Sequence, residues 1–197
     1  MYNTVRDNFL WSAIRASPFI YFIFGILNIT INPSFDTYYY IIAYIFNFIL
    51  NGLLKKSTQK IYNTLKTDYI YPFGKGSRPI NATNCGTFSI SNNPKSNSFG
   101  MPSGHSQLTW FFTTYFIFKI LHNNNYINYN FIPINYNINI QILISISILI
   151  IISFLVSYSR VNIEGCHTQE QVIIGTIIGI ISGLVIFNIE QYIKLLF

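Results

Sequence analysis

Long apolar stretches constrain the fold of this chain more than any other feature of its sequence. A transmembrane helix needs about 20 mostly apolar residues to cross a hydrocarbon core about 30 Å thick. Five stretches approach that length, although the first and third are short; they cover residues 17–31, 38–54, 107–121, 138–158 and 172–189. The pattern predicts an all-α, polytopic membrane bundle of about five transmembrane helices.

The composition also indicates that the bilayer is the solvent. The 197 residues are 51% hydrophobic and 9% charged, a balance too apolar and too charge-poor for an ordinary soluble domain. The net charge of +6 would suit nucleic acid binding, but the basic residues lie between the apolar stretches, so we expect no nucleic acid partner. Two distant cysteines and six scattered acidic residues offer no metal-ligand cluster.

Polar segments separate the apolar stretches. Residues 32–34 read Asn-Pro-Ser and predict a tight hairpin turn between the first two spans. A polar insert occupies about residues 56–101, and another polar segment covers residues 122–137. If five spans alternate across the bilayer, the N-terminus, the insert and residues 160–170 lie on one membrane face. We expect the active site on that face.

The N-terminus carries basic residues without a cleavage pattern. Arg6 and Arg15 precede the first apolar stretch, and no small-residue cleavage site follows it. We therefore expect a retained anchor and not a removed signal peptide. The chain is predicted to be a single membrane-embedded domain over residues 1–197 of a multi-pass integral membrane protein.

The strongest chemical signal is Pro102-Ser103-Gly104-His105, which opens the third stretch. Ser103 stands where an N-cap hydroxyl would satisfy the first free amides of a helix. Gly104 leaves room for a phosphate oxygen near those amides, and His105 lies beside it at the positive end of the helix dipole. A helix cap followed by an interfacial histidine would explain the same residues, so both interpretations stay open for this segment alone.

The second signal joins the last two stretches. Arg160 ends the fourth stretch, and His167 precedes the fifth. Gln171 lies one helical turn beyond His167, where it can accept a hydrogen bond from the ring. A histidine held in this way has one nitrogen fixed and the other free to attack. The structural alternative is an arginine that merely reaches the membrane interface.

The third signal, Lys75 and Arg78 followed by proline, is weak by itself because such residues are common in interfacial loops. This signal becomes informative when it is combined with the first two signals. Arg78, Arg160 and a lysine would surround one phosphoryl group, while two histidines supply a nucleophile and an acid. Fixed cations and helix amides can stabilise the charge of a phosphoryl transition state without a metal.

These segments resemble the signature of the phosphatidic acid phosphatase type 2 superfamily, which is Lys-x6-Arg-Pro, Pro-Ser-Gly-His and Ser-Arg-x5-His-x3-Asp. Within it, the chain looks most like the dolichyl diphosphatases in residues 100–103, 105–107, 110–112, 154–161, 167–168 and 171–172. The resemblance implies that His167 attacks phosphorus to give a phosphohistidine and that His105 protonates the leaving oxygen. It also implies phosphate binding by Arg78, Arg160, Ser103, Gly104 and a lysine, without a cofactor or metal.

The lysine of the signature is displaced in this chain. Tyr71 stands at the family position, seven residues before Arg78. We expect Lys55, at the end of the second span, to take that role, with an insertion between it and Arg78. Lys75 is nearer in sequence but out of pattern, and it stays as the alternative.

The last segment departs from the signature twice. Six residues, and not five, separate Arg160 from His167. On a helix the extra residue would rotate His167 by about 100°, so the link must bulge, which Gly165 permits. Gln171 takes the place of the usual Asp, as it does in the dolichyl diphosphatase pattern, and can orient His167 but not stabilise its cation by charge.

We therefore predict metal-independent, cofactor-free hydrolysis of a lipid phosphate or diphosphate, most specifically a polyisoprenyl (dolichyl-type) diphosphate. A phosphatidate or other lipid monoester phosphatase is the alternative within the enzyme class. A weakly active lipid-phosphate-binding protein and a small channel are the alternatives outside it. The expected partners are the lipid substrate and the bilayer, and the sequence does not indicate an oligomeric state.

Two observations predict opposite membrane orientations. Lys and Arg lie mostly on the motif-bearing face, which the positive-inside tendency makes cytoplasmic. The dolichyl diphosphatase resemblance favours instead an active site on the lumenal side of the endoplasmic reticulum. A glycosylation sequon at Asn81 lies on the same face, and a lumenal location would allow Cys85 and Cys166 to pair.

Overall fold

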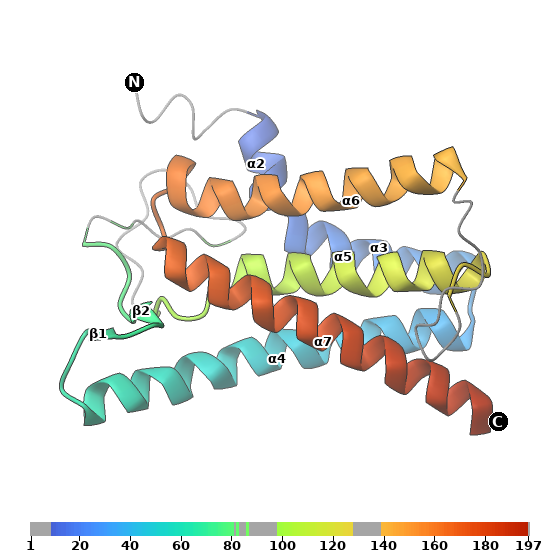
Figure 1. The fold of residues 1–197 in the computed structure, drawn as a ribbon. Helices are drawn as coiled ribbons and strands as arrows, with labels where there is room; N and C mark the ends of the chain where they lie inside the picture. The colour runs from blue at the N-terminus through green and yellow to red at the C-terminus, as the bar shows by residue number, and fades with distance from the viewer. Residues whose placement is uncertain (1–8, 81, 83–85, 87–97, 128–138, 197) are drawn as a thin grey trace.

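Long helices and one short strand pair make up the described part of the fold (Figure 1). The structure is a computed structural model and describes residues 9–80, 82, 86, 98–127 and 139–196. The elements are α2 (Phe9–Arg15), α3 (Ser17–Ile31), α4 (Phe35–Thr64), β1 (Tyr69–Ile70), β2 (Gly74–Lys75), α5 (Gly104–Asn123), α6 (Ile140–Tyr158), the π-helical turn η1 (Ser159–Ile163) and α7 (Gln169–Leu196). The all-α prediction is confirmed, because each predicted span coincides with a helix.

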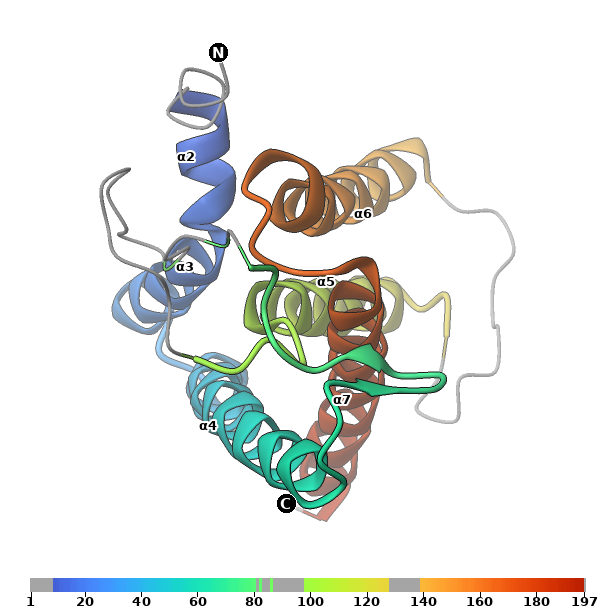
Figure 2. The ribbon, with the colours of Figure 1, turned by 90° about the vertical axis from the view of Figure 1, so that its left-hand side faces the viewer.

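Helix α5 lies at the centre of the bundle, packed against α3, α4, α6 and α7 (Figure 2). Polar residues on it are buried, among them Ser106, Gln107 and Thr113. Gln107 accepts a hydrogen bond from Asn51 of α4 at 2.8 Å. Because its neighbours shield α5 from lipid, this helix can carry polar side chains that a lipid-facing helix could not.

A row of glycines lets α7 approach the backbone of α5. Gly175, Gly179 and Gly183 recur every fourth residue and therefore lie on one helix face. A Cβ atom at these positions would lie 2.6 Å from the carbonyl oxygen of Ser103, 2.4 Å from that of Gln107 and 2.8 Å from a side-chain carbon of Thr114, respectively. Close backbone approach through small residues is a common way for membrane helices to associate.

Among the residues that the structure describes, fewer helices are able to span a membrane by themselves than the five predicted. Three are long and apolar enough, namely α4, α7 and α6 continued through η1. The pair α2 and α3, bent by 65°, makes a fourth if it counts as one span. Helix α5 matches the predicted third span in position, but its polar residues keep it from passing as a span by composition. Its central place in the bundle explains that difference, and the chain is a multi-pass membrane protein.

Helix α4 extends well beyond the predicted second span. It continues through Thr64 and includes the first part of the polar insert. At about 1.5 Å per residue, its 30 residues are about 45 Å long, more than a hydrocarbon core requires. Ser34 and Thr37 form a capping box at its start, directly after the predicted hairpin turn. The strand pair β1–β2 follows α4 and lies over the same end of the bundle (Figure 1).

The link between Arg160 and His167 bulges as predicted. Residues 159–163 form a π-helical turn, which accommodates one residue more than an α-helical turn. Gly165 then adopts φ +58°, a left-handed conformation that favours glycine. The carbonyl of Arg160 accepts hydrogen bonds from the backbone amides of Cys166 and His167 at 3.0 and 3.2 Å. The extra residue is thereby absorbed before α7 begins.

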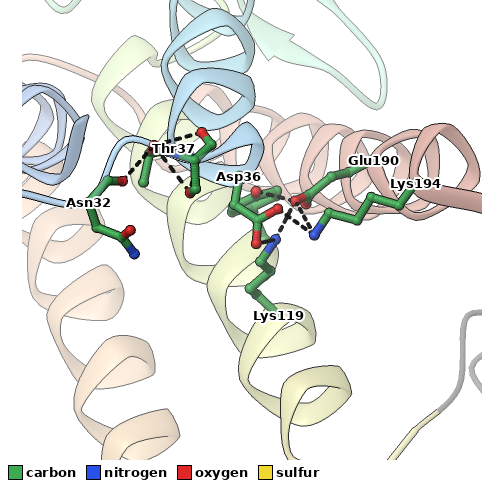
Figure 3. Close-up of polar contacts among 8 residues, drawn as sticks. Asn32, Asp36, Thr37, Lys119, Glu190 and Lys194 are labelled. Atoms are coloured by element: carbon green, nitrogen blue, oxygen red, sulfur yellow. Dashed lines mark hydrogen bonds and ion pairs between the residues drawn. The ribbon is translucent and has the colours of Figure 1, made fainter. Parts of the chain in front are cut away.

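A charge cluster ties three helices together at the far end of the bundle (Figure 3). Lys119 of α5 lies 2.9 Å from Asp36 of α4 and also pairs with Glu190 of α7. Lys194 bridges the same two carboxylates. Tyr115 donates a hydrogen bond to Glu190 at 2.8 Å. The sequence analysis did not anticipate this cluster, although Glu190 and Lys194 have the spacing of a helical ion pair.

Two predictions involve residues outside the described ranges. Asn81 and Thr83 of the sequon and Cys85 of the predicted cysteine pair lie there. Cys166 is buried and forms a disulfide. The pairing of Cys166 with Cys85 stays a prediction, because Cys85 lies outside the described residues.

Candidate active site

Segments far apart in sequence meet at one end of the bundle. The starts of α5 and α7, the end of α6 and the strand pair lie together there (Figure 1). Figure 2 views this end directly and shows α2 beside it. In the residues that the structure describes, the N-terminal segment, the insert and the link lie at the same end of the bundle, and their location at one membrane face stays a prediction.

His167 is held by Gln171 in one tautomer. Its Nδ1 lies 2.9 Å from Oε1 of Gln171. The amide nitrogen of Gln171 donates hydrogen bonds to the carbonyls of Lys75 and Ser77 at 2.8 and 2.7 Å, so its oxygen must be the atom that faces the ring. Nδ1 therefore carries the proton and Nε2 keeps its lone pair. This is the arrangement that a nucleophilic histidine needs.

The surroundings of His167 keep its ring uncharged. The side chain is buried, with 3% of its surface exposed. Burial, followed by the positive charges of Arg160, Arg78 and Lys55, holds the pKa of His167 well below its ordinary value of 6.5. The hydrogen bond with Gln171 opposes this shift but does not overcome it. His167 is thus neutral near neutral pH, and its Nε2 lone pair is available.

His105 lies in the first turn of α5, as predicted, and is held by the end of α2. Its Nε2 lies 3.1 Å from the main-chain carbonyl oxygen of Arg15. A carbonyl can only accept a hydrogen bond, so Nε2 carries a proton in this arrangement. Nδ1 is then the nitrogen left to face a bound substrate.

The charges of Arg160, Arg78 and Lys55 act on both His105 and His167. The two imidazoles therefore have the same three positively charged neighbours. The side chain of Arg160 is almost fully buried, with 1% of the residue exposed, and its Nη1 lies 2.6 Å from Oε2 of Glu164. A buried group of cations of this kind favours a bound anion.

Arg78 and Lys55 are anchored to the segment that precedes α5. The guanidinium of Arg78 donates to the carbonyl of Ser98 at 3.0 Å and to its hydroxyl at 2.9 Å. It also donates to the carbonyl of Cys166 at 3.4 Å, which links the insert to the α6–α7 connection. Lys55 donates from Nζ to the carbonyl of Phe99 at 3.2 Å.

The two candidate lysines differ in their surroundings. Lys55 acts on both histidines, as described above. The ammonium group of Lys75 lies 3.3 Å from Asp68 on the exposed hairpin. Hydrogen bonds from Ser77 and the pairing with Lys75 outweigh burial and lower the pKa of Asp68, so that carboxylate is charged and holds the lysine. These contacts favour Lys55 over Lys75 as a phosphate ligand.

Ser103 and Gly104 lie at the start of α5, but their contacts differ from the expected ones. Ser103 occupies the N-cap position, yet its hydroxyl makes no capping hydrogen bond; it lies 3.1 Å from the hydroxyl of Ser106, which donates to it. A Cβ atom on Gly104 would lie 2.8 Å from Oδ1 of Asn51. The glycine therefore makes room for the Asn51 amide, and phosphate binding by Ser103 and Gly104 stays a prediction.

Two residues of this region were missed by sequence reasoning. Glu164 bridges Arg160 and Arg15, with its Oε1 lying 3.2 Å from Nε of Arg15. The spacing of Arg160 and Glu164 is that of a helical ion pair and could have indicated their contact. No comparable signal exists for Arg15, because its partner is distant in sequence.

Within the described residues, no group of three or more His, Cys, Asp or Glu side chains is placed to hold a metal ion. The expectation of metal independence is therefore a prediction for experiment.

Comparisons with known proteins agree with the geometry. The profile of the PAP2 superfamily matches residues 36–195. Human Dolichyldiphosphatase 1 is 36% identical to the chain over 94 residues, and the mouse protein of the same name is 38% identical over 94 residues. Each match covers 47% of this chain and 37% of the relative. The chain thus matches little more than a third of the length of these relatives. No solved structure matches it significantly.

Proposed function

This chain belongs to the PAP2 superfamily, and we propose that it hydrolyses a lipid-borne phosphate or diphosphate through a phosphohistidine on His167. The observation that carries the proposal is the state of His167. Its Nδ1 is fixed by Gln171, which leaves the Nε2 lone pair free in a neutral ring. The positive charges of Arg160, Arg78 and Lys55 act on that ring, and these three cations suit the oxygens of a phosphoryl group.

In the first step, the Nε2 lone pair of His167 forms a bond to phosphorus while the bond from phosphorus to the leaving oxygen breaks. The bound phosphoryl anion favours a second proton on His105, at the Nδ1 that faces it, and His105 donates this proton to the leaving oxygen, so the leaving group departs without an additional negative charge. The cations stabilise the charge that spreads over the equatorial oxygens of the transition state. The products of the step are a phosphohistidine and either a lipid alcohol or a lipid monophosphate.

In the second step, water attacks the phosphohistidine. His105, now neutral, takes a proton from the water, and the bond between phosphorus and Nε2 breaks with its electron pair returning to nitrogen. Inorganic phosphate leaves, and both histidines regain their starting states. The reaction consumes one water and needs no redox partner.

An apolar cavity beside the site supports a lipid substrate. It has a volume of about 290 Å³ and lies between α3, α4 and α5. Leu108, which lines it, is one helical turn beyond His105 on the same face of α5. Phe48, also in its lining, lies two turns from Lys55 on α4. A hydrocarbon chain in this cavity would have its head group at the cations.

The substrate class that we propose is a polyisoprenyl diphosphate. The relatives named Dolichyldiphosphatase 1 support this choice, and the same likeness makes the endoplasmic reticulum the proposed location. Phosphatidate and other lipid monoesters share the phosphoryl chemistry and are the competitors to test.

A substrate panel with a metal chelator present tests reaction class and leaving group together. Purified protein in a lipid bilayer would be given a polyisoprenyl diphosphate, a polyisoprenyl monophosphate or phosphatidate, and phosphate release would be measured. We expect the fastest release from the diphosphate and none from His167→Ala. His122→Ala is the matched control, since His122 lies in the last turn of α5 and carries no proposed role.

Equal phosphate release by the wild type and His167→Ala would overturn the nucleophile assignment. Substrate binding by a folded wild type without turnover would instead indicate a lipid-phosphate-binding protein. Preference for phosphatidate would keep the mechanism and change the substrate class.

A further inference from the structure

Glu164 lies between two arginines at the site end of the bundle. Its Oε2 accepts from Nη1 of Arg160 at 2.6 Å, and its Oε1 accepts from Nε of Arg15 at 3.2 Å. The carboxylate is fully buried in this position, and the Arg15 side chain is 6% exposed. Fixed charge pairs of this kind restrict the side chains they join.

Arg15 comes from outside the segment that matches the family profile, which begins at residue 36. It is the last residue of α2, which packs against the end of α6 and against η1 (Figure 2). The same residue touches the site a second time, because its main-chain carbonyl holds Nε2 of His105. Arg15 thus contacts the proposed acid directly and Arg160 through Glu164.

The extra residue of the link accounts for the position of Glu164. The π-helical turn places the amide of Glu164 against the carbonyl of Ser159 at 2.8 Å and brings its side chain back onto Arg160. The lengthened segment therefore supplies the carboxylate that fixes the arginine.

We propose that Arg15 and Glu164 are positioning residues of the active site, which hold the Arg160 guanidinium and the His105 ring where a phosphoryl group binds. The inference rests on the proposed function. Arg160 must present its fork to the transition state at a fixed place, and a displacement of about 1 Å costs about a hundredfold in rate. Glu164 also removes one unit of positive charge from the region and so weakens the attraction for free phosphate.

Two variants separate this role from a purely structural one. In Glu164→Gln, one arginine faces an amide N–H in place of an oxygen, and the site gains positive charge. We expect kcat to fall about 10- to 100-fold, while the inhibition constant of inorganic phosphate falls at least about threefold because phosphate binds more tightly. In Arg15→Met, kcat falls similarly, but the site loses a positive charge, so that inhibition constant rises.

Misfolding could lower kcat in both variants, but it could not shift the inhibition constant of phosphate in opposite directions. An inhibition constant does not depend on the fraction of protein that is active. Arg15→Lys should recover part of the kcat lost in Arg15→Met, since an ammonium group can still pair with Glu164. Glu190→Gln is the matched control: it changes an equally buried carboxylate between two cations at the far end. It should leave kcat per folded molecule and the inhibition constant unchanged.

The rate of the wild type is measured first. A wild type without phosphate release would refute the proposed function, whereas the positioning role is judged only on an active wild type. With an active wild type, three results would overturn the positioning role. They are an unchanged kcat in Glu164→Gln, shifts of the inhibition constant in the same direction for both variants, and equal effects of Glu190→Gln and Glu164→Gln.

Discussion

The two ends of the bundle both hold buried charges, but they balance them differently. At the far end, Lys119 and Lys194 face Asp36 and Glu190, so two positive and two negative charges cancel. At the site end, Glu164 pairs with Arg15 and Arg160, and Lys55 and Arg78 act with Arg160 on the two histidines. Within this set of described residues, four positive charges stand against one carboxylate.

The difference indicates what each end does. A neutral cluster is complete by itself and joins α4, α5 and α7. An excess of buried positive charge is costly unless an anion joins it. The site end therefore has the charge of an incomplete complex, which a phosphoryl group would complete. Each prediction below changes one end and uses the other as its reference.

The largest effect on turnover is expected from Arg160→Met. This variant removes the guanidinium that we propose faces the transition state, and it leaves Glu164 with Arg15 as its partner. We expect kcat/KM to fall by about 10²- to 10³-fold, measured as phosphate release per folded molecule. A fall of less than about threefold would show that Arg160 does not act on the reacting phosphoryl group.

The largest effect on stability is expected from Lys119→Met at the far end. It removes the cation between Asp36 and Glu190, and Glu190 is fully buried. We expect the free energy of unfolding to fall by about 3 kcal/mol, measured by equilibrium unfolding in mixed micelles. Turnover per folded molecule should not change, and adding Glu190→Gln should recover part of the stability. A loss of turnover in the folded fraction would contradict the division between the two ends.

A smaller effect is expected in the pH profile. Because burial and three cations lower the pKa of His167, the neutral nucleophile persists below the ordinary histidine value of 6.5. The acid limb of kcat/KM, which reports the free enzyme, should therefore lie below pH 6.5. Lys55→Met removes one of those charges, so the pKa should rise and the limb should move to higher pH. An acid limb that is unmoved in Lys55→Met would place this lysine outside the site.

The smallest effect is expected from Lys75→Met. Its ammonium group pairs with Asp68 on the exposed hairpin, and exposed pairs contribute little, about 0 to 1 kcal/mol. We expect kcat/KM within about threefold of the wild type, because the main-chain carbonyl of Lys75, which accepts from Gln171, is retained. A loss as large as that of Lys55→Met would show that Lys75 is the phosphate-binding lysine.

The sequence predicted helices well where the bilayer supplied the signal. Helix α3 has the predicted bounds, and α6 agrees with its predicted span to within a few residues. Beyond the bilayer the signal is lost, so the continuation of α4 to Thr64 was not predicted. Helix α5 differs in another way: its neighbours shield it from lipid, so it needs little apolar surface, and its composition gives a weak signal for a span.

The site was predictable where chemistry follows local spacing. His167 and Gln171 are one helical turn apart, and their contact follows from that spacing. The roles of Arg15 and Glu164 depend on how α2 packs against η1, which no local pattern encodes. Gln171 illustrates the same limit, because its amide also binds the carbonyls of Lys75 and Ser77, which are distant in sequence.

The account depends most on the transfer of a phosphoryl group to His167. The direct measurement is to mix protein with a polyisoprenyl diphosphate that carries radiolabelled terminal phosphate, quench in base, which preserves phosphohistidine, and map the label by mass spectrometry. We predict label on His167, and once formed this label should be lost more slowly in His105→Ala because the attack of water is slowed. Turnover with no label on the protein, or label on a residue other than His167, would contradict the account.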